Sequence, residues 1–553
     1  MSRPAKVAKP SEPEIEDLAR QWLAIDYLPQ TKKVVQDLLD AGDKPVDDPP
    51  LPHRAVRDRD HALGESLTVN FPRGLVCVRM YYIHDVRLTK QPNVSQAMEK
   101  LLRKRLAFGT AGLRGPMGAG YSCMNAVTVW QCTQGIVAYL EKTMGSNKLK
   151  AQGVVIGYDH RDDGQGVTSE MMARAAAAVC VHKGIKVYLY STIVATPMVP
   201  FCVKNKGCAA GMMVTASHNP KADNGYKMYG ANGAQLCEPH DVAIADLILD
   251  NLQPWADYGK ESESVRSSPL CVDNLAEMKE AYFKEMADTL CYHREDNSAS
   301  DLKIVYTAMH GVGTPFTTKA FEMFGHKPLV MVPEQNSPDP TFPTVAYPNP
   351  EEGKGALELS FKAAKAAGSP LVLANDPDAD RLAVAELQAD GQWRMFSGNE
   401  IGMILAHWLF TKAKEKGAEV NKLAVVASTV SSKMTRALAQ KEGMRFEETL
   451  TGFKWICNKK ADLQKEGYKV VVAFEESIGF CCGDLVNDKD GVCAAAVFAE
   501  MAVQAYAKGS SVGQHMDQLY DTYGHFVSRQ GYVIVPDPSL TVAIFERCLK
   551  LKA

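Results

Sequence analysis

"CAAGMMVTASHNPKADNGYKMYG", residues 208–230, is the stretch that decides the fold of this chain of 553 residues. Its first seven residues are apolar or small and carry no charge, which predicts a buried strand. Ser217 follows almost at once, and the Asn-Pro and Asn-Gly pairs after it are signals of sharp turns. Two interpretations are open here: a plain surface turn, or a nucleophilic serine held at the lip of a cleft.

The same strand pattern recurs along the chain, with helical stretches in between. This alternation is typical of α/β units with a largely parallel sheet. We therefore predict an α/β protein with three successive similar domains, whose mixed, mostly parallel sheets surround a central cleft. The other predicted strands are residues 153–159, 185–190, 301–309, 370–376, 421–430 and 468–476.

The predicted domains occupy residues 96–300, 301–410 and 411–525. Residues 1–13 are expected to be disordered, residues 14–39 to form a helix, and residues 95–106 to form another. A Pro-, Asp- and Arg-rich insertion, largely loop, is expected between them at residues 41–94. Residues 526–553, with one strand-like run "QGYVIVPD" and a short helix, are too few for a domain of their own.

Composition narrows the class of protein. The net charge is −3, which supplies no basic field for nucleic acid. No apolar run approaches the 18 or so residues of a membrane span, and the first residues lack the apolar core of a secretory signal. The 14 cysteines contain no CxxC pair, which favours free thiols and a cytoplasmic location.

A second polar cluster, "NDPDADR", follows the predicted strand 370–376. Asp376, Asp378 and Asp380 are spaced two residues apart, and three carboxylates this close repel one another unless a cation lies among them. Oxygen ligands of this kind suit Mg²⁺, although an Asp-rich surface turn is the plainer alternative. Arg381 directly after them could pair with a phosphate.

Four further polar clusters are candidates, and two of them, "AFEESIGF" and "HGVG", lie at the ends of predicted strands, where ligands bind in open α/β sheets. "FGTAGLRGPMG" offers backbone N–H groups and Arg114 to an anion. Taken singly, each of the four is explained as well by a turn; taken together, they suit phosphoryl transfer. The other three are "AFEESIGF" with Glu475 and Ser477, "TLTGFKW" with Thr451 and Lys454, and "HGVG" with His310.

These motifs resemble the α-D-phosphohexomutases, and most of all the type-2 phosphoglucomutase and phosphopentomutase branch, which includes glucose-1,6-bisphosphate synthase. The stretches "GTAGLR", "TASHNPKADNGYK", "NDPDADRLAVAE", "FSGNE", "STVSSK" and "FEESIGF" occur in family order within residues 96–525. The resemblance implies a phosphoserine domain, a Mg-binding domain and a sugar-binding domain in that order. It implies Mg²⁺ as cofactor, a sugar 1,6- or 1,5-bisphosphate as intermediate and activator, sugar phosphates as the only partners, and a monomer.

The resemblance also implies a role for each candidate residue. Ser217 would carry the phosphoryl group, and its oxygen would join the three aspartates around the metal. Sugar 1-phosphate would be exchanged with glucose 6-phosphate or with ribose or deoxyribose 5-phosphate. The remaining roles are Arg114 and Lys227 for charge neutralisation or proton movement, His218 beside the phosphate, Arg381 to orient it, Glu475 and Ser477 for sugar hydroxyls, and Thr451 and Lys454 for the sugar face or its phosphate.

The family pattern has a fourth domain with an Arg-Thr-Ser-Gly-Thr-Glu-Pro-type loop that grips the phosphate not being transferred, and no such string occurs here. We therefore expect residues 526–553 to be a remnant of that domain and turnover to be impaired. Two alternatives stay open: a glucose-1,6-bisphosphate synthase and a non-catalytic, truncated relative.

Overall fold

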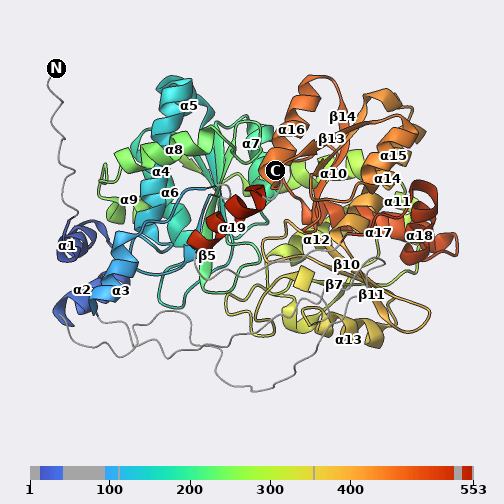
Figure 1. Cartoon of the computed structure of the whole chain (residues 1–553), viewed down its shortest axis with the longest axis horizontal. Helices are drawn as coiled ribbons and strands as arrows, with labels where there is room; N and C mark the ends of the chain where they lie inside the picture. The colour runs from blue at the N-terminus through green and yellow to red at the C-terminus, as the bar shows by residue number, and fades with distance from the viewer. Residues whose placement is uncertain (1–12, 42–93, 110–111, 353–354, 529–537, 551–553) are drawn as a thin grey trace.

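The computed structural model describes residues 13–41, 94–109, 112–352, 355–528 and 538–550. Three α/β units follow one another in the chain, each built around its own sheet (Figure 1). The predicted fold class is therefore confirmed. The predictions for residues 1–12, for most of the insertion at 42–93 and for the strand-like run near 530–537 lie outside the described residues.

The first unit has a six-stranded sheet in the order β1-β5-β4-β2-β3-β6. Its central strands β2 and β4 pair in parallel and are buried at every position, because helices cover both faces and leave no room for polar alternation. The elements are β1 (Leu113–Pro116), β2 (Val154–Tyr158), β3 (Val187–Leu189), β4 (Ala210–Val214), β5 (Asp223–Gly230) and β6 (Cys271–Val272), with α4 (Ala126–Met144), α5 (Ser146–Gln152), α6 (Ser169–His182), α7 (Met198–Lys206), α8 (His240–Asp250) and α9 (Tyr258–Ser264).

The second unit has a five-stranded sheet in the order β11-β10-β9-β7-β8. Two helices, α10 (Leu275–Leu290) and α11 (Arg294–Ala299), lead into it. Strand β9 lies at the centre, so the loop that follows it opens in the middle of the sheet edge. The elements are β7 (Ile304–Thr307), β8 (Val330–Met331), β9 (Leu371–Ala374), β10 (Ala383–Leu387) and β11 (Trp393–Phe396), with α12 (Gly313–Phe324) and α13 (Glu358–Ala367).

The third unit has a four-stranded sheet in the order β13-β12-β14-β15. One apolar core continues from the second unit into the third, since Phe321 of α12 and Phe498 of α17 belong to the same buried cluster. The elements are β12 (Leu423–Ser428), β13 (Arg445–Thr449), β14 (Lys469–Glu475) and β15 (Gly479–Cys482), with α14 (Gly398–Glu415), α15 (Met434–Glu442), α16 (Phe453–Lys465), α17 (Gly491–Ala507) and α18 (Val512–Tyr523).

The N-terminal helix expected at residues 14–39 is wrong in one respect, because two helices occupy it: α1 (Ile15–Ile25) and α2 (Pro29–Ala41). Asp26 between them is extended, and its carboxylate accepts hydrogen bonds from Trp22 Nε1 at 3.0 Å and Thr31 Oγ1 at 2.6 Å. Pro29 cannot continue a helix from α1, but it is tolerated as the first residue of the next one.

Two further helices complete the described structure. The helix predicted at residues 95–106 is α3 (Val94–Met98) followed by a short π-helical turn that ends at Arg103. The short helix predicted near the end of the chain is α19 (Pro538–Lys550).

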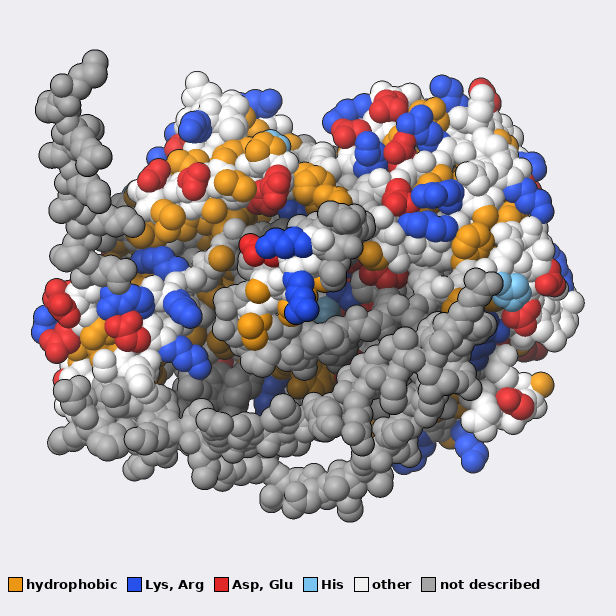
Figure 2. Space-filling model, viewed as in Figure 1, with side chains coloured by type: hydrophobic (Ala, Val, Ile, Leu, Met, Phe, Trp, Pro, Cys, Tyr) orange, Lys and Arg blue, Asp and Glu red, His pale blue; other side chains and the backbone are white. Residues whose placement is uncertain are grey.

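The surface carries charges of both signs. On the face drawn in Figure 2, basic and acidic side chains are interspersed over the described domains. No described helix combines the length and the hydropathy that crossing a bilayer requires.

Candidate active site

Ser217 stands three residues beyond the end of β4, in the left-handed region with φ 54°. Its backbone N–H donates to Thr215 Oγ1 at 2.9 Å. Its hydroxyl donates to Asp376 Oδ2 at 2.8 Å, and His218 Nδ1 lies 3.2 Å from the same Oγ. The sharp turn therefore aims a buried hydroxyl at the first of the three predicted metal ligands.

Asp376, Asp378 and Asp380 are all fully buried in the loop after β9, and one oxygen from each lies within 4.8 Å of the others. Ala379 between them has φ 57°, which folds the loop back on itself. Gly311 of the "HGVG" motif packs against this loop, because a Cβ there would lie 2.3 Å from the Cα of Pro377. Three buried carboxylates this close together repel one another, so cations are needed to balance their negative charge.

Lys227 on β5 supplies one of those cations. Its Nζ lies 2.8 Å from Asp378 Oδ2 and 2.9 Å from Asp380 Oδ2, and Thr196 Oγ1 donates to Asp378 Oδ2 at 2.7 Å. Burial opposes the charge on Lys227, but the two carboxylates outweigh burial and raise its pKa. Burial and the neighbouring Asp378 and Asp380 raise the pKa of Asp376, which is the cost of one uncompensated negative charge.

Lys227 contacts one oxygen of each of these two carboxylates and leaves the other oxygen of each without a hydrogen-bond partner among the described atoms. These two oxygens, Asp378 Oδ1 and Asp380 Oδ1, are buried. Buried carboxylate oxygens without donors are ligands that Mg²⁺ prefers. Ser217 Oγ is linked to this group of carboxylates by its hydrogen bond to Asp376. The triad is therefore consistent with the metal site that the sequence predicts.

Three other predicted residues surround Ser217. His218 is neutral, since burial, with Arg381 and Arg114 adding to it, lowers its pKa to about 2. Arg114 donates to Asn219 Oδ1 at 2.8 Å, two residues beyond the serine. Arg381 donates to the carbonyl oxygen of Ser477 at 3.1 Å, which joins the aspartate loop to the third unit.

The four predicted residues of the third unit lie differently. Glu475 is buried at the end of β14, where burial raises the pKa of its carboxyl, and Ser477 follows in the turn that Arg381 contacts. Lys454 is also buried, but its Nζ lies 3.1 Å from Asp241 Oδ2 of the first unit. Thr451 is exposed, and within the described residues no hydrogen bond joins it to the aspartates.

Sequence reasoning missed three residues at this site. Lys489 Nζ lies 3.6 Å from Asp380 Oδ2, Thr196 binds Asp378, and Arg161 lies under the loop of Ser217. Arg161 follows strand β2 by three residues and Lys489 follows β15 by seven. Their position after a strand was the available signal, but their single charges did not stand out from a surface turn.

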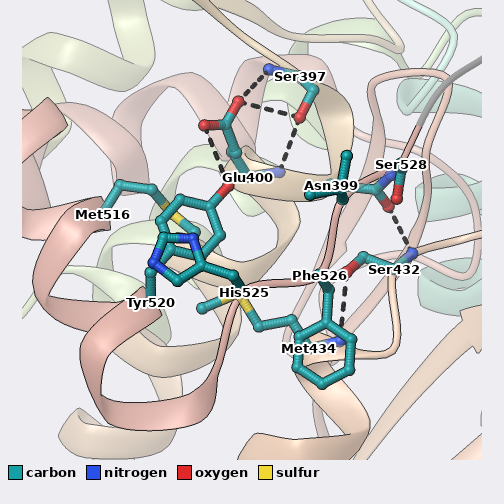
Figure 3. A pocket seen from close by; sticks show the side chains of 11 residues that line it. Ser397, Asn399, Glu400, Ser432, Met434, Met516, Tyr520, His525, Phe526 and Ser528 are labelled. Atoms are coloured by element: carbon teal, nitrogen blue, oxygen red, sulfur yellow. Dashed lines mark hydrogen bonds between the residues drawn. The ribbon is translucent and has the colours of Figure 1, made fainter. Parts of the chain in front are cut away.

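A cavity of about 330 Å³ lies in the third unit, behind the turn of Glu475. Figure 3 shows that its polar groups bind one another: Ser397 and Glu400 cap α14, and Asn399 Oδ1 accepts from the backbone of Ser432 at 2.7 Å. The motifs "FSGNE" and "STVSSK" thus build the support for that turn, since a Cβ on Gly398 would lie 2.0 Å from the carbonyl oxygen of Glu476.

Comparison with known families gives three matches in order along the chain. They are phosphoglucomutase/phosphomannomutase α/β/α domain I at residues 105–254, domain II at residues 280–389 and domain III at residues 397–523.

Curated relatives agree with these matches. Human phosphopentomutase is 47% identical over 83% of this chain and 75% of its own. Human glucose 1,6-bisphosphate synthase is 44% identical over 84% of this chain and 76% of its own. Phosphoribomutase of Saccharomyces cerevisiae is 40% identical over 81% of this chain and 73% of its own.

Solved structures share the fold. A phosphoglucomutase/phosphomannomutase family protein from Burkholderia thailandensis superposes with a TM-score of 0.56 at 19% identity, over 75% of this chain and 79% of that one. The open form of parafusin, a phosphoglucomutase from Paramecium, has a TM-score of 0.56 at 18% identity, over 76% of each chain.

Proposed function

The chain belongs to the phosphoglucomutase/phosphomannomutase family, in the branch of phosphopentomutases and glucose 1,6-bisphosphate synthases, and on that premise we propose that it exchanges a sugar 1-phosphate with the 5- or 6-phosphate through a phosphorylated Ser217. It is an isomerase of phosphosugars. The observation that carries the proposal is the 2.8 Å hydrogen bond from Ser217 to Asp376, which joins the nucleophile of one unit to the metal ligands of the next.

In each transfer step the bonds formed and broken and the protons moved are balanced. In the first step the bond between phosphorus and Ser217 Oγ breaks, and a bond from phosphorus to a sugar hydroxyl oxygen forms. The hydroxyl loses a proton and Oγ gains one, so that a sugar bisphosphate and a free serine result. The second step runs in reverse with the other phosphate, which returns Ser217 to its phosphorylated form.

The chain's own residues neutralise charge around this step. Lys227 lies between Asp378 and Asp380, and the charges of Arg114 and Arg381 act on His218 next to Ser217. Asp376, Asp378, Asp380 and the serine oxygen would hold Mg²⁺. The ion, when bound, supplies positive charge to the transferring phosphoryl group. In the third unit Glu475 and Ser477 would accept or donate hydrogen bonds to sugar hydroxyls, and Lys454 would reach the non-reacting phosphate after leaving Asp241.

The substrate we propose first is a pentose phosphate, since relatives named phosphopentomutase and phosphoribomutase are 40–48% identical. The 44% identical glucose 1,6-bisphosphate synthase supports a second candidate, in which an acyl phosphate donor phosphorylates Ser217. Product analysis with ribose 1-phosphate and glucose 1-phosphate, each with and without 1,3-bisphosphoglycerate, separates them. Isomerisation without the donor indicates a mutase, and bisphosphate formed only with the donor indicates a synthase.

The central test is mass spectrometry of Ser217 after incubation with a sugar bisphosphate. We expect phosphate on Ser217 and conversion of a sugar 1-phosphate by the same sample. An unphosphorylated Ser217 and no conversion would refute the proposal and leave the non-catalytic alternative.

Two finer expectations stay proposals. Low turnover of the 553-residue chain is tested by measuring its kcat beside that of a phosphopentomutase relative, and equal values would contradict it. A reducing, cytoplasmic location is supported by the described cysteines, all of which are free thiols, most of them buried.

A further inference from the structure

Arg161 lies under the loop of Ser217 with its side chain fully buried. One terminal nitrogen donates to the carbonyl oxygens of Ser217 at 2.7 Å and Asn219 at 2.8 Å. The other donates to those of Pro220 at 2.8 Å and Asp223 at 2.9 Å. A single guanidinium therefore binds four carbonyl oxygens within seven residues.

These contacts answer a problem that the loop creates. Ser217 is not a glycine, yet it is held at φ 54°, a strained conformation that persists only when the surroundings enforce it. The carbonyl that Arg161 binds belongs to Ser217 itself, and Thr215 Oγ1 binds the N–H of the same residue. Both peptide groups beside the serine are thus held, and its hydroxyl points at Asp376.

Arg161 is itself held in place. Its backbone N–H donates to Asp159 Oδ1 at 3.0 Å, and its Nε lies 3.4 Å from Asp159 Oδ2. Ser169 Oγ donates to the same carboxylate at 2.5 Å, and Asn224 Nδ2 donates to Ser169 at 2.9 Å. The support closes on the strand that follows the serine loop, since Asn224 is the second residue of β5.

The charge of Arg161 suits the same place. A guanidinium is planar, always charged and presents its donors in a rigid fork, whereas a lysine offers one point charge. Here the guanidinium nitrogens bind backbone carbonyls of the serine loop. The positive charge of Arg161 therefore lies next to Ser217, the residue that would take a phosphate, but Arg161 does not bind that phosphate.

We propose that Arg161 is a positioning residue for phosphoryl transfer: it holds the backbone of Ser217 in the one conformation that aims Oγ at the metal ligands, cycle after cycle. The proposal rests on the proposed function in taking Ser217 as the phosphoryl carrier. Among the described residues, Arg161 contacts Ser217 only at its backbone carbonyl and forms no hydrogen bond or ion pair with Ser217 Oγ or with the three aspartates, so its effect is expected on the rate of transfer and not on substrate affinity.

The test compares Arg161→Lys with Arg266→Lys in the full chain. Arg266 is the matched control, since it also binds backbone carbonyls of the first unit, those of Leu189 and Tyr190, but within the described residues it forms no hydrogen bond with the loop of Ser217. We expect Arg161→Lys to lower kcat and the single-turnover transfer from phosphorylated Ser217 by about 10²-fold, because misplacement by about 1 Å has that effect. KM should stay within about threefold, and Arg266→Lys should leave both constants within about threefold.

A second measurement does not depend on the function. In hydrogen–deuterium exchange, Arg161→Lys should speed exchange in residues 215–225, and Arg266→Lys should not. If wild-type Ser217 takes no phosphate, the proposed function fails, and the exchange result still tests whether Arg161 holds the loop.

Two outcomes would overturn the inference. One is a folded Arg161→Lys protein with wild-type transfer rate or wild-type exchange in residues 215–225. The other is a loss of activity that only follows the fraction of folded protein, to the same extent in both variants. Should Arg161→Lys not fold, Asp159→Asn weakens the hold on Arg161 without removing it and is judged by the same two readouts.

Discussion

Two regions carry the candidate site residues, and they are built in opposite ways. The carboxylate floor, formed by Ser217, Lys227, Asp376, Asp378 and Asp380, is buried and joined by hydrogen bonds of 2.8–2.9 Å. The third-unit rim is formed by Thr451, Lys454, Glu475 and Ser477. One member of the rim is exposed, and another is paired with Asp241.

This difference indicates that the floor would stabilise the transition state and that the rim would recognise the substrate. The floor has its charges in place before substrate arrives, which is the arrangement that stabilises a transition state. We propose that the rim groups exchange their present partners for a bound sugar, which suits recognition of the part that does not react. Changes in the floor should therefore act on kcat, and changes in the rim on KM.

The largest effect is expected from Ser217→Ala. Removing the oxygen that carries the phosphoryl group should lower kcat by at least about 10⁴-fold, because no second route replaces a nucleophile. The measurement is isomerisation of a sugar 1-phosphate, with Ser298→Ala, at an exposed serine of α11, as control. Residual activity within tenfold of wild type would end the case for the floor as the reacting region.

Lys227→Met should have the next largest effect. We expect kcat to fall by about 10²- to 10³-fold, as for loss of one preorganised charge in a dry site. Binding of Mn²⁺, followed by calorimetry, should become tighter, because Asp378 and Asp380 lose their ammonium partner and attract a divalent ion more strongly. Weaker Mn²⁺ binding in a folded variant would contradict the view that Lys227 and the metal share the same carboxylates.

Lys454→Met tests the rim. KM should rise about tenfold while kcat stays within about threefold, since binding of the non-reacting part is lost equally in the ground and transition states. Asp241→Asn breaks the same ion pair from the other side and should not raise KM, although both variants lose stability because a buried partner is left behind. A fall in kcat with unchanged KM in Lys454→Met would move Lys454 from the rim to the floor.

The last prediction concerns stability, and not catalysis, at the point where the third unit touches the floor. Asp490 caps α17, and the N–H of Gly491 after it donates to the carbonyl oxygen of Ala379, between two of the aspartates. Burial raises the pKa of the Asp490 carboxyl to about 7. In an unfolded chain an aspartate titrates near pH 3.9, so the folded state holds this proton more tightly.

The sign of the pH effect follows. The stability that the bound proton contributes is complete below pH 4 and is lost as the pH rises through about 7. Asp490→Asn keeps the acceptor for Tyr282 and Cys493 but has no such proton. The free energy of unfolding of this variant, measured by urea titration, should therefore rise relative to that of the wild type between pH 4 and 7, by at most about 4 kcal/mol. An unchanged difference across this range would show that Asp490 titrates normally, and Asp517→Asn serves as an exposed control.

The sequence predicts the fold well because strands buried on both faces leave uninterrupted apolar runs, as in β4 and β9. It also predicts the aspartates and Ser217, because their residue types are unusual at a strand end. It does not reveal which residues meet. The serine and Asp376 are 159 residues apart, and Lys454 and Asp241 are 213 apart.

The direction of a side chain across such a span depends on how the units pack. For that reason the sequence predicts that Lys454 contacts the sugar face or its phosphate, and does not reveal Asp241 of the first unit as its partner. The role of Arg161 is hidden for a related reason: its two terminal nitrogens donate to backbone carbonyls, and backbone acceptors leave no mark in the sequence.

The charged pairs between the units limit how single units can be exchanged between related genes. Lys227 belongs to the first unit, the carboxylates it pairs with belong to the second, and Tyr229 beside it donates to Asp488 of the third at 2.8 Å. No unit carries a complete set, so exchanging one of them for the counterpart from a distant relative leaves a buried charge without its opposite. The three units must therefore be inherited together. A recombination point between two units is tolerated only where both parent genes encode the same charged residues at the contacts between those units.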